Sequence, residues 1–490
     1  MRRLLAGIGA GLLLLGAPAN WAQENVSTAD LMKVIQEQNK KIEALTQRIQ
    51  QLESRQAPAP AGDTSQIKAG LTETNEALAA TNKKLDALDH RLILGKGIDG
   101  LKLTGDLRVR YEQRDRHLNG GPEDSSKGDQ DRARFRSRLR LGGIWTNKDE
   151  GWEVGAGVAT GEKNDDRSTN DTWGHDSYIF EKGNLYLDYA YAKHTWTDPF
   201  GSETFSGPVS LTLGQQKNPL ISTLVTWDGD INPAGFTAQY GDPKGKEYKG
   251  PFLTLGAYVL SYTATGQKID GDNQEKWDDN VWLYASQLGY AHKSDSFDAL
   301  GLIGCSHVTS TYRNIAAAAW ANTNSSNPNT AWGGADSGYE YQVGEVYGEV
   351  KTSVSGIELK PYGHVAMNFG ADGNMSQAKN NATSTTIDPS HDNLAWMLGL
   401  DLKRGKWSLG YGYAYIEADA VFGPAREGDF GETTGLNDTD LQGHVIKLAY
   451  APLKNLSLGT TLYLLERIED VKSTEADKAQ LLQFDASYKF

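Results

Sequence analysis

The sequence predicts an all-β fold, a transmembrane antiparallel β-barrel of about sixteen strands, preceded by a signal peptide and an N-terminal α-helical coiled coil. Three observations predict it. Segments in which apolar and polar residues alternate recur from residue 101 to the C-terminus. The connections between these segments alternate between long and short. Only 38% of the residues are hydrophobic, which suits a barrel because its strands need apolar side chains at alternate positions only.

The composition excludes several other classes of protein. No run of about 20 apolar residues occurs beyond the N-terminus, which excludes a bundle of membrane-spanning helices. The formal net charge of −14 argues against nucleic acid as a partner. The single cysteine, Cys305, excludes an internal disulfide framework, and we expect it to be a small residue of the barrel wall.

Residues 1–22 are predicted to form a signal peptide. Arginines supply its positive start, Leu4–Leu15 its apolar core, and small residues up to Ala19 or Ala22 a cleavage site. The apolar core is too short to span a membrane, so we expect export and cleavage rather than an uncleaved anchor.

A coiled coil is predicted for residues 27–94, with a hinge at 57–64. Apolar residues recur at alternating steps of four and three, and Pro58 and Pro60 interrupt them because proline cannot continue a helix. We expect this segment to hold subunits together, and its core residues leave the choice between a dimer and a trimer open. The alternative is a strut that contacts the cell wall.

The barrel itself is predicted for residues 95–490. In its first strand, Leu101, Leu103, Leu107, Val109 and Tyr111 share one face and polar residues share the other. The predicted strands span 101–114, 132–146, 151–160, 184–197, 208–216, 233–241, 251–265, 281–293, 296–312, 340–354, 356–370, 393–403, 406–419, 441–451, 455–468 and 479–490.

The connections support the same topology. Barrels of the bacterial outer membrane have short periplasmic turns and long extracellular loops, so we expect both ends of the barrel to be periplasmic. Long connections cover 115–131, 161–183, 217–232, 266–280, 314–339, 371–392, 420–440 and 469–478, whereas short ones cover 147–150, 294–295, 355, 404–405 and 452–455.

The second strand carries an unusual row of arginines. Because arginine at the middle of a lipid-facing surface costs about 2–4 kcal/mol, we expect this row to face the lumen. One interpretation is a wall whose charges are paired with Asp106, Glu112 and loop carboxylates. The other is one half of a pore constriction that attracts anions or orients dipolar solutes. The predicted pore-lining residues are Arg108, Arg110, Arg132, Arg134, Arg136, Arg138 and Arg140.

Two regions carry a resemblance to known proteins. The C-terminal strand alternates apolar and polar residues and ends in Phe490, which resembles the closing strand of outer-membrane barrels. The stretch GQQKNPL, followed by WDGDINP, GF and QY between residues 214 and 240, resembles the bacterial putative-porin family. The resemblance covers roughly the whole barrel and implies a sixteen-stranded porin of the Gram-negative outer membrane.

The resemblance also assigns a constriction loop. In sixteen-stranded porins the third loop folds into the barrel and narrows it. Carried onto this chain, Lys217, Asn218, Asp228 and Asp230 would face the arginine wall across the pore. The alternative is a solvated turn held by Asx hydrogen bonds, which the Asp-Gly-Asp sequence equally allows.

Three functions are compatible with these observations. The first is a porin for passive diffusion of small hydrophilic solutes, the second a porin that prefers anions or phosphate. The third is a structural barrel that tethers the outer membrane to the cell wall. We expect a homotrimer in contact with outer-membrane lipid. Enzyme motifs and metal-ligand spacings of histidine are absent from the sequence, so we expect no enzyme, no metal site and no cofactor.

Overall fold

The computed structural model describes most of the predicted barrel. The described residues are 100–117, 131–162, 165, 167–174, 182–201, 206–245, 247–261, 281–309, 341–371, 392–431, 438–468 and 478–490. The chain divides into two compact units, Met1–Leu88 and Asp89–Phe490, and every described residue belongs to the second. The predicted signal peptide and coiled coil therefore lie outside the described residues. Within those residues, no helix is long and apolar enough to cross a membrane.

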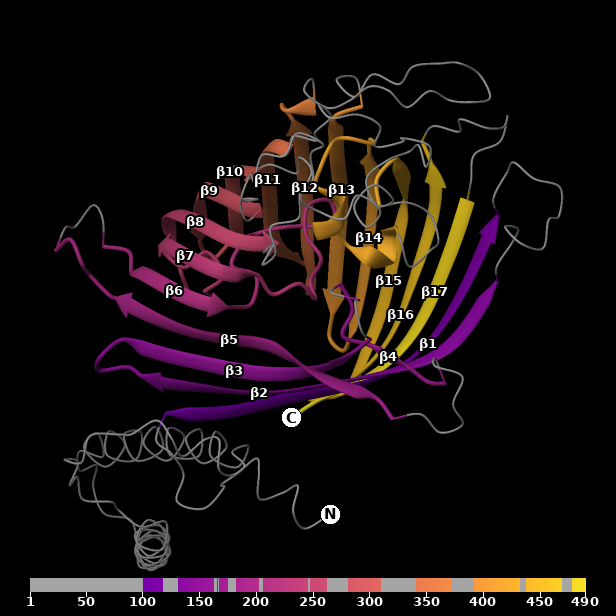
Figure 1. Ribbon diagram of the computed structural model, residues 1–490, viewed down its shortest axis with the longest axis horizontal. Coiled ribbons are helices and arrows are strands. Elements are labelled where there is room, and N and C mark those ends of the chain that lie inside the picture. Colours follow the sequence, from indigo (N-terminus) through magenta and orange to yellow (C-terminus); the bar gives the residue numbers. More distant parts are fainter. Residues whose placement is uncertain are drawn as a thin grey trace, which may run out of the picture. The chain divides into compact units, whose positions relative to one another are not determined.

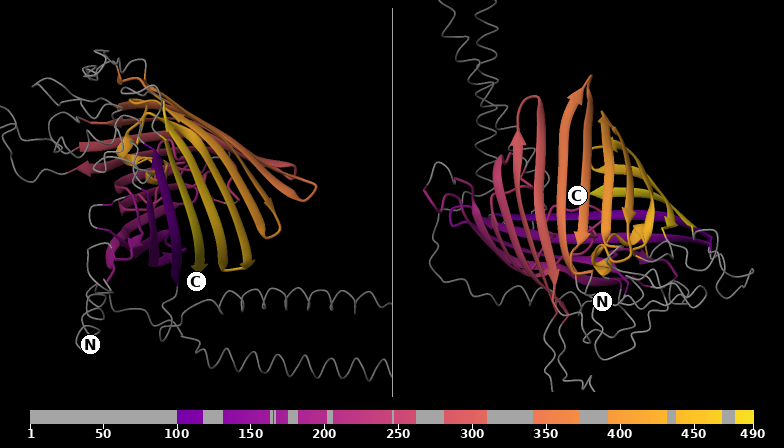
Figure 2. Two further views of the ribbon diagram at one scale, coloured as in Figure 1. Left: turned by 90° about the vertical axis from the view of Figure 1, so that its right-hand side faces the viewer. Right: turned by 90° about the horizontal axis from the view of Figure 1, so that it is seen from above.

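The strands of the second unit form a closed antiparallel barrel (Figures 1 and 2). The long strands are β1 (Leu101–His117), β2 (Arg132–Asn147), β3 (Trp152–Gly161), β5 (Asn184–Trp196), β6 (Val209–Gln215), β7 (Ala234–Tyr240), β8 (Gly250–Ser261), β9 (Val281–Lys293), β10 (Phe297–Val308), β11 (Tyr341–Val354), β12 (Ile357–Asn368), β13 (Leu394–Arg404), β14 (Trp407–Ile416), β15 (Leu441–Leu453), β16 (Leu456–Arg467) and β17 (Lys478–Lys489).

Pairing of the last strand with the first closes the barrel. The register runs from Asp106 opposite Lys489 to His117 opposite Lys478, and Figure 1 shows the yellow β17 beside the indigo β1. Closure gives each long strand in the described ranges a neighbour on both sides, as a sheet in lipid requires. The structure therefore confirms the predicted sixteen-stranded barrel.

A two-residue strand, β4 (Asp171–Thr172), lies outside this ring of long strands. It pairs with β2 at Arg136 and Ser137, beyond the stretch of β2 that β3 covers. The next residue, Trp173, is 55% exposed and stacks on Phe135 with 5.7 Å between ring centroids. The short strand thus fills the part of the wall that β3 is too short to reach.

The alternation in the sequence sorts side chains between the two faces of the wall. Leu107, Phe135 and Leu398 are exposed on the outer face, whereas Arg110 and Arg136 are buried in the lumen. Because successive side chains of a strand point to opposite faces, each strand can face lipid and water at once.

One predicted strand is too long. The prediction of 406–419 extends past β14, which ends at Ile416. Beyond that residue the chain forms two short 3₁₀ helices, η3 (Gly423–Ala425), with a proline in its first turn, and η4 (Gly428–Phe430). Apolar residues of this connection are buried rather than exposed to lipid, which is why the hydrophobic pattern continues although the strand does not.

Two connections pack together inside the barrel. We call residues 216–233, between β6 and β7, loop 3, and residues 417–440, between β14 and β15, loop 7. Val225 and Trp227 of loop 3 and Phe430 of loop 7 share an apolar cluster with inward-facing wall residues such as Leu283 and Val343. Burial of this apolar surface favours the inward position of both loops.

Candidate functional site

The charged side chains of β1 and β2 are aligned by the register of these two strands. Facing residues of an antiparallel pair have Cβ atoms about 4.5–5.5 Å apart, so like charges placed directly opposite destabilise the pair. Three of the facing pairs are arginine opposite arginine, and carboxylates must compensate them. The register places Asp106 opposite Arg140, Arg108 opposite Arg138, Arg110 opposite Arg136, Glu112 opposite Arg134 and Arg114 opposite Arg132.

Glu112 is the central carboxylate of this wall. It is fully buried, and its carboxylate oxygens lie 3.1 Å from Arg132, 2.7 Å from Arg134 and 3.8 Å from Arg136. Gln483 of β17 also donates a hydrogen bond to it. The buried carboxylate is thus compensated at short range, while the three guanidinium groups share its single negative charge.

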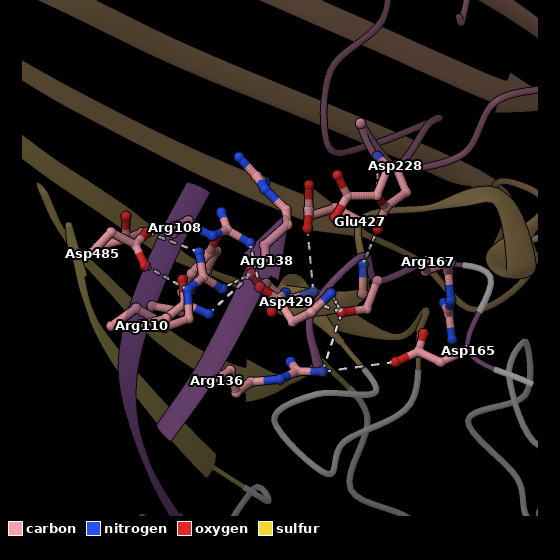
Figure 3. Close-up of a pocket in the computed structure, with 18 of the residues that line it drawn as sticks. Arg108, Arg110, Arg136, Arg138, Asp165, Arg167, Asp228, Glu427, Asp429 and Asp485 are labelled. Atoms are coloured by element: carbon pink, nitrogen blue, oxygen red, sulfur yellow. Dashed lines mark hydrogen bonds and ion pairs between the residues drawn. The ribbon is translucent and has the colours of Figure 1, made fainter. Parts of the chain in front are cut away.

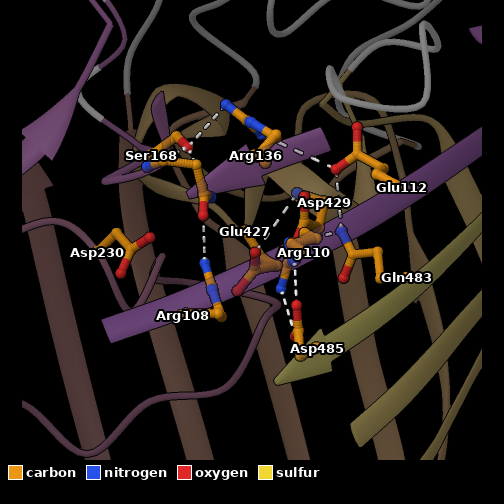
Figure 4. A network of polar contacts seen from close by, with 12 residues as sticks. Arg108, Arg110, Glu112, Arg136, Ser168, Asp230, Glu427, Asp429, Gln483 and Asp485 are labelled. Carbon is orange, nitrogen blue, oxygen red and sulfur yellow. Dashed lines mark hydrogen bonds and ion pairs between the residues drawn. The ribbon is translucent and has the colours of Figure 1, made fainter. Parts of the chain in front are cut away.

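The remaining wall arginines have carboxylate partners from several parts of the chain. The Asp106 carboxylate forms ion pairs with Arg138 at 2.8 Å and with Arg140 at 3.0 Å. Arg110 lies between Asp485 of β17, at 2.8 Å, and Asp429 of loop 7, at 3.2 Å (Figure 4). The predicted pairing with Asp106, Glu112 and loop carboxylates therefore describes most of the row.

Loop 3 is held to loop 7 by backbone and side-chain hydrogen bonds. The Asp228 backbone N–H donates to the carbonyl of Ala425 at 2.7 Å, and Asp228 Oδ2 accepts from the Gly428 N–H at 2.9 Å. Arg426, which is fully buried, donates from Nε to the Val225 carbonyl at 3.1 Å. These bonds fix the Asp-Gly-Asp turn of loop 3 in the lumen.

The other part of loop 3 is attached to the wall opposite the arginines. Gln287 of β9 accepts from the Ile221 N–H at 2.9 Å and donates to its carbonyl at 2.7 Å. His364 of β12 is hydrogen-bonded through Nδ1 to Thr223 Oγ1 at 2.8 Å and through Nε2 to Glu345 Oε2 at 3.0 Å. Loop 3 is therefore held on one side by loop 7 and on the other by the wall opposite the arginines.

Loop 3 contacts the arginine wall through Asp230. Its Oδ1 lies 3.3 Å from Arg140, and its Oδ2 accepts a hydrogen bond from Thr169 Oγ1 at 3.2 Å. Two neighbouring carboxyl groups have raised pKa values. Burial and the nearby Glu427 raise the pKa of Asp228 to about 9, and burial together with Asp429 raises the pKa of Glu427 to about 7.

These elements enclose a polar cavity of about 500 Å³ (Figure 3). Of the predicted pore-lining arginines, all except Arg140 line it. Of the predicted loop residues, Asp228 and Asp230 line it. The full lining comprises Arg108, Arg110, Arg132, Arg134, Arg136, Arg138, Glu162, Asp165, Arg167, Ser168, Asn170, Asp228, Gly229, Asp230, Glu427, Gly428, Asp429, Lys447, Thr461, Tyr463, Gln483 and Asp485.

The other two predicted loop residues lie elsewhere. Lys217 is exposed, with its ammonium 5.0 Å from the centre of the Tyr189 ring. Asn218 Oδ1 accepts a hydrogen bond from the Leu220 N–H at 2.9 Å, the Asx turn that the alternative interpretation described. Neither residue is among those that line the cavity.

Sequence reasoning missed the contribution of loop 7. Glu427 and Asp429 line the cavity beside Asp228, yet they are about 200 residues away in the chain. In the sequence Glu427 and Asp429 are two of seven carboxylates between residues 417 and 440, and no pattern distinguishes them from the others. Strand periodicity cannot show which loops fold inward, so this pair gave no prediction.

A closed barrel with an apolar outer face, a charged lumen and an inward-folded loop is the architecture of a porin-type barrel. A family model described as "Putative porin" matches residues 119–302, a range that includes the arginine-rich strand and loop 3. This match confirms the resemblance of the chain to the putative-porin family. No curated protein matches the sequence.

The solved structures that match this chain include the following three. The high-pH structure of OprB from Pseudomonas putida is 12% identical, with a TM-score of 0.46, and the match covers 80% of this chain and 94% of that one. The outer-membrane channel DcaP of Acinetobacter baumannii is 15% identical, with a TM-score of 0.41 and coverage of 80% and 97%. The anion-selective porin from Comamonas acidovorans is 14% identical, with a TM-score of 0.42 and coverage of 80% and 99%.

Proposed function

We propose that the protein is an outer-membrane porin, a water-filled channel for passive diffusion of small hydrophilic solutes. The observation that carries the proposal is the position of loop 3, whose Asp230 lies 3.3 Å from Arg140 inside a closed barrel. A loop anchored across the lumen narrows the path without sealing it, since a polar cavity of about 500 Å³ remains beside it. A purely structural barrel has no need of a charged lumen.

The constriction has opposite charges on its two sides. Arginines of β1 and β2 form one side, and carboxylates of loops 3 and 7 form the other (Figure 3). Fixed charges of opposite sign across a narrow passage produce a transverse field, which orients a dipolar solute and hinders an apolar one. This arrangement favours passage of small polar molecules over passage of apolar molecules.

The same proposal covers assembly and location. We expect a homotrimer in the Gram-negative outer membrane, with the coiled coil of residues 27–94 in the periplasm. The coiled coil would join subunits, and contact with the cell wall remains the alternative for that segment. The predicted coiled coil lies outside the described residues.

Planar-bilayer recording of the purified full-length protein tests the channel. Wild-type protein should give discrete conductance steps, and a variant in which residues 220–231 are replaced by a short Gly-Ser linker should give larger steps. Heat-modifiability on gels verifies that each barrel is folded. Folded wild-type barrels that give no conductance would contradict the porin and favour the structural tether.

A further inference from the structure

Most basic residues that line the cavity already have a carboxylate partner. Glu112 compensates Arg132, Arg134 and Arg136. Outside that group, Arg110 is paired with Asp429 and Asp485, Arg138 with Asp106, and Arg167 with Asp438. Two lining cations are exceptions, Arg108 and Lys447.

Arg108 is the wall arginine without an ion pair to any described residue. Its Nη2 donates to Asn170 Oδ1 at 2.7 Å, a neutral acceptor, and its Nε has no hydrogen-bond partner. Figure 4 shows its guanidinium beside the Arg110–Asp485 pair rather than within it. Two directions of the guanidinium fork therefore remain for a ligand oxygen.

Lys447 lies on the same inner wall as Arg108. The register connects Lys447 to Thr461, Thr461 to Gln483 and Gln483 to Glu112 in one row across β15, β16, β17 and β1. At about 4.8 Å between neighbouring strands, this row places Lys447 about 14 Å from Glu112. Arg108 lies four residues from Glu112 along β1, about 13 Å at about 3.3 Å per residue, so the Cα atoms of Arg108 and Lys447 are about 20 Å apart. In the described part of the chain Lys447 forms no ion pair, and it lines the same cavity. Two long side chains can reach a small ligand across that span.

The carboxylates without a cationic partner do not cancel these two charges at neutral pH. Asp228 and Glu427 form no ion pair with any residue in the described ranges, and they lie side by side in Figure 3. Burial raises the pKa of both, so Asp228 is largely protonated and Glu427 is partly protonated near pH 7. Within the described residues, Arg108 and Lys447 are therefore the lining cations whose charge is not offset by a direct ion pair.

We propose that Arg108 and Lys447 form a subsite that binds the oxyanion group of a passing solute, a carboxylate or a phosphate. Guanidinium and ammonium groups without an ion-pair partner in the protein have N–H donors available for a ligand oxyanion. The subsite depends on the proposed channel, because the solute must pass through the lumen to reach it. Its effect would be to favour small organic acids or phosphorylated solutes over cations of the same size.

Single-channel recording with the substitutions Arg108→Gln, Lys447→Gln and both together tests the subsite. The probes are inorganic phosphate and acetate, added to a potassium chloride bath, and the readouts are the reversal potential in a salt gradient and saturable block of the chloride current. Arg134→Gln is the charge-matched control, because Glu112 keeps its other two arginines in that variant.

The expected result is an unequal response to equal losses of charge. Arg108→Gln should shift the reversal potential toward cations about twice as far as Arg134→Gln, and the double variant should weaken block by either probe at least about tenfold. Arg108→Lys should restore part of the block, which distinguishes lost charge from lost folding. If block by phosphate changes and block by acetate does not, the subsite takes phosphates alone.

Equal shifts for Arg108→Gln and Arg134→Gln, with block unchanged in the double variant, would overturn the subsite and leave only a diffuse field. That outcome leaves the porin itself intact, since wild-type channels would still conduct. Absence of conductance in folded wild-type protein would instead remove the porin, and the subsite with it.

Discussion

Asp228 in loop 3 accepts a hydrogen bond from the backbone N–H of Gly428 in loop 7, 200 residues further along the chain, at 2.9 Å. This bond joins two connections that each fold into the lumen. Because loop 3 is also bound to β9 and β12 on the opposite wall, it bridges the barrel rather than hanging from one side. The width of the constriction is thus set by contacts on both sides.

Loss of the His364 anchor should widen the pore. His364 is 1% exposed and connects Thr223 to Glu345, so His364→Ala leaves a buried carboxylate with one partner fewer and weakens the anchor by about 1–3 kcal/mol. We expect larger and noisier conductance steps in planar bilayers. His444→Ala is the control, because His444 is hydrogen-bonded to the exposed Tyr411 and does not contact loop 3. Identical traces from both variants would show that His364 does not hold the loop.

Removal of the central carboxylate should destabilise the barrel. Glu112→Gln leaves Arg132, Arg134 and Arg136 without their shared charge partner in a buried place, and breaking a buried pair costs about 3–5 kcal/mol. Urea-dependent unfolding, followed by heat-modifiability on gels, should show a clearly lower midpoint.

The matched control for that experiment is Glu358→Gln. Its carboxylate pairs with Lys351 at 3.2 Å, and both side chains are more than 40% exposed. Exposed pairs contribute about 0–1 kcal/mol, so this midpoint should hardly move. Equal midpoints for the two variants would mean that the arginines near Glu112 are compensated by other groups.

Anion preference should fall as the pH rises from 5 to 9. The pKa values of Glu427 and Asp228 are raised to about 7 and about 9, so both carboxyls are protonated at pH 5 and gain negative charge across this range. Added negative charge beside Arg108 and Lys447 lowers the local potential for anions. Reversal potentials measured in a salt gradient at each pH should move toward cations.

Glu427→Gln should flatten the part of that curve around pH 7. The charged or titratable groups that influence this carboxyl pair are Asp230, Arg426, Asp429, Lys447 and Tyr463. These groups remain in the variant, so the difference between the two curves reports Glu427. A variant curve that follows the wild-type curve throughout would assign the pH dependence to other groups.

The N-terminal segment should be dispensable for the barrel. Among the described residues the first barrel strand begins at Leu101, and β1 pairs there with β2 and β17. Deletion of residues 27–92 should therefore leave a heat-modifiable, conducting barrel, and chemical cross-linking should reveal fewer trimers. A truncated protein without heat-modifiability would show that the segment is part of the folding unit.

Much of the barrel could be predicted from the sequence, because the two-residue period reports which side chains face lipid. The predicted 281–293 coincides with β9, and the predicted 132–146 ends one residue before β2 does. The period failed where loop 7 buries apolar residues without being a strand, and the predicted 356–370 runs two residues past the end of β12 at Asn368. It also placed the arginines on the inner face, since Phe135 and Leu141 between them are exposed.

The balance of charge in the lumen could not be predicted in the same way. Whether an arginine is paired depends on carboxylates that distant segments bring to it, and periodicity says nothing about these. Arg110 and Arg108 have the same place in the pattern, yet Asp485 and Asp429 reach the first and not the second. Asp228 and Asp230 of loop 3 line the same cavity as the arginines, whereas Lys217 and Asn218 precede the stretch that crosses the lumen.

The partners of Arg110 have a consequence for the order in which the molecule assembles. Asp429 and Asp485 are 319 and 375 residues beyond it in the chain, among the longest separations a contact in this protein can have. Contacts of that range form late, because the intervening chain must be ordered first. The β1–β2 hairpin therefore brings its own carboxylates to most of the arginine row, whereas Arg110 stays without its two partners until the end of the chain is in place. The final strand, which closes the wall, also supplies Asp485 to Arg110, so closure of the barrel and completion of this ion pair occur in the same step.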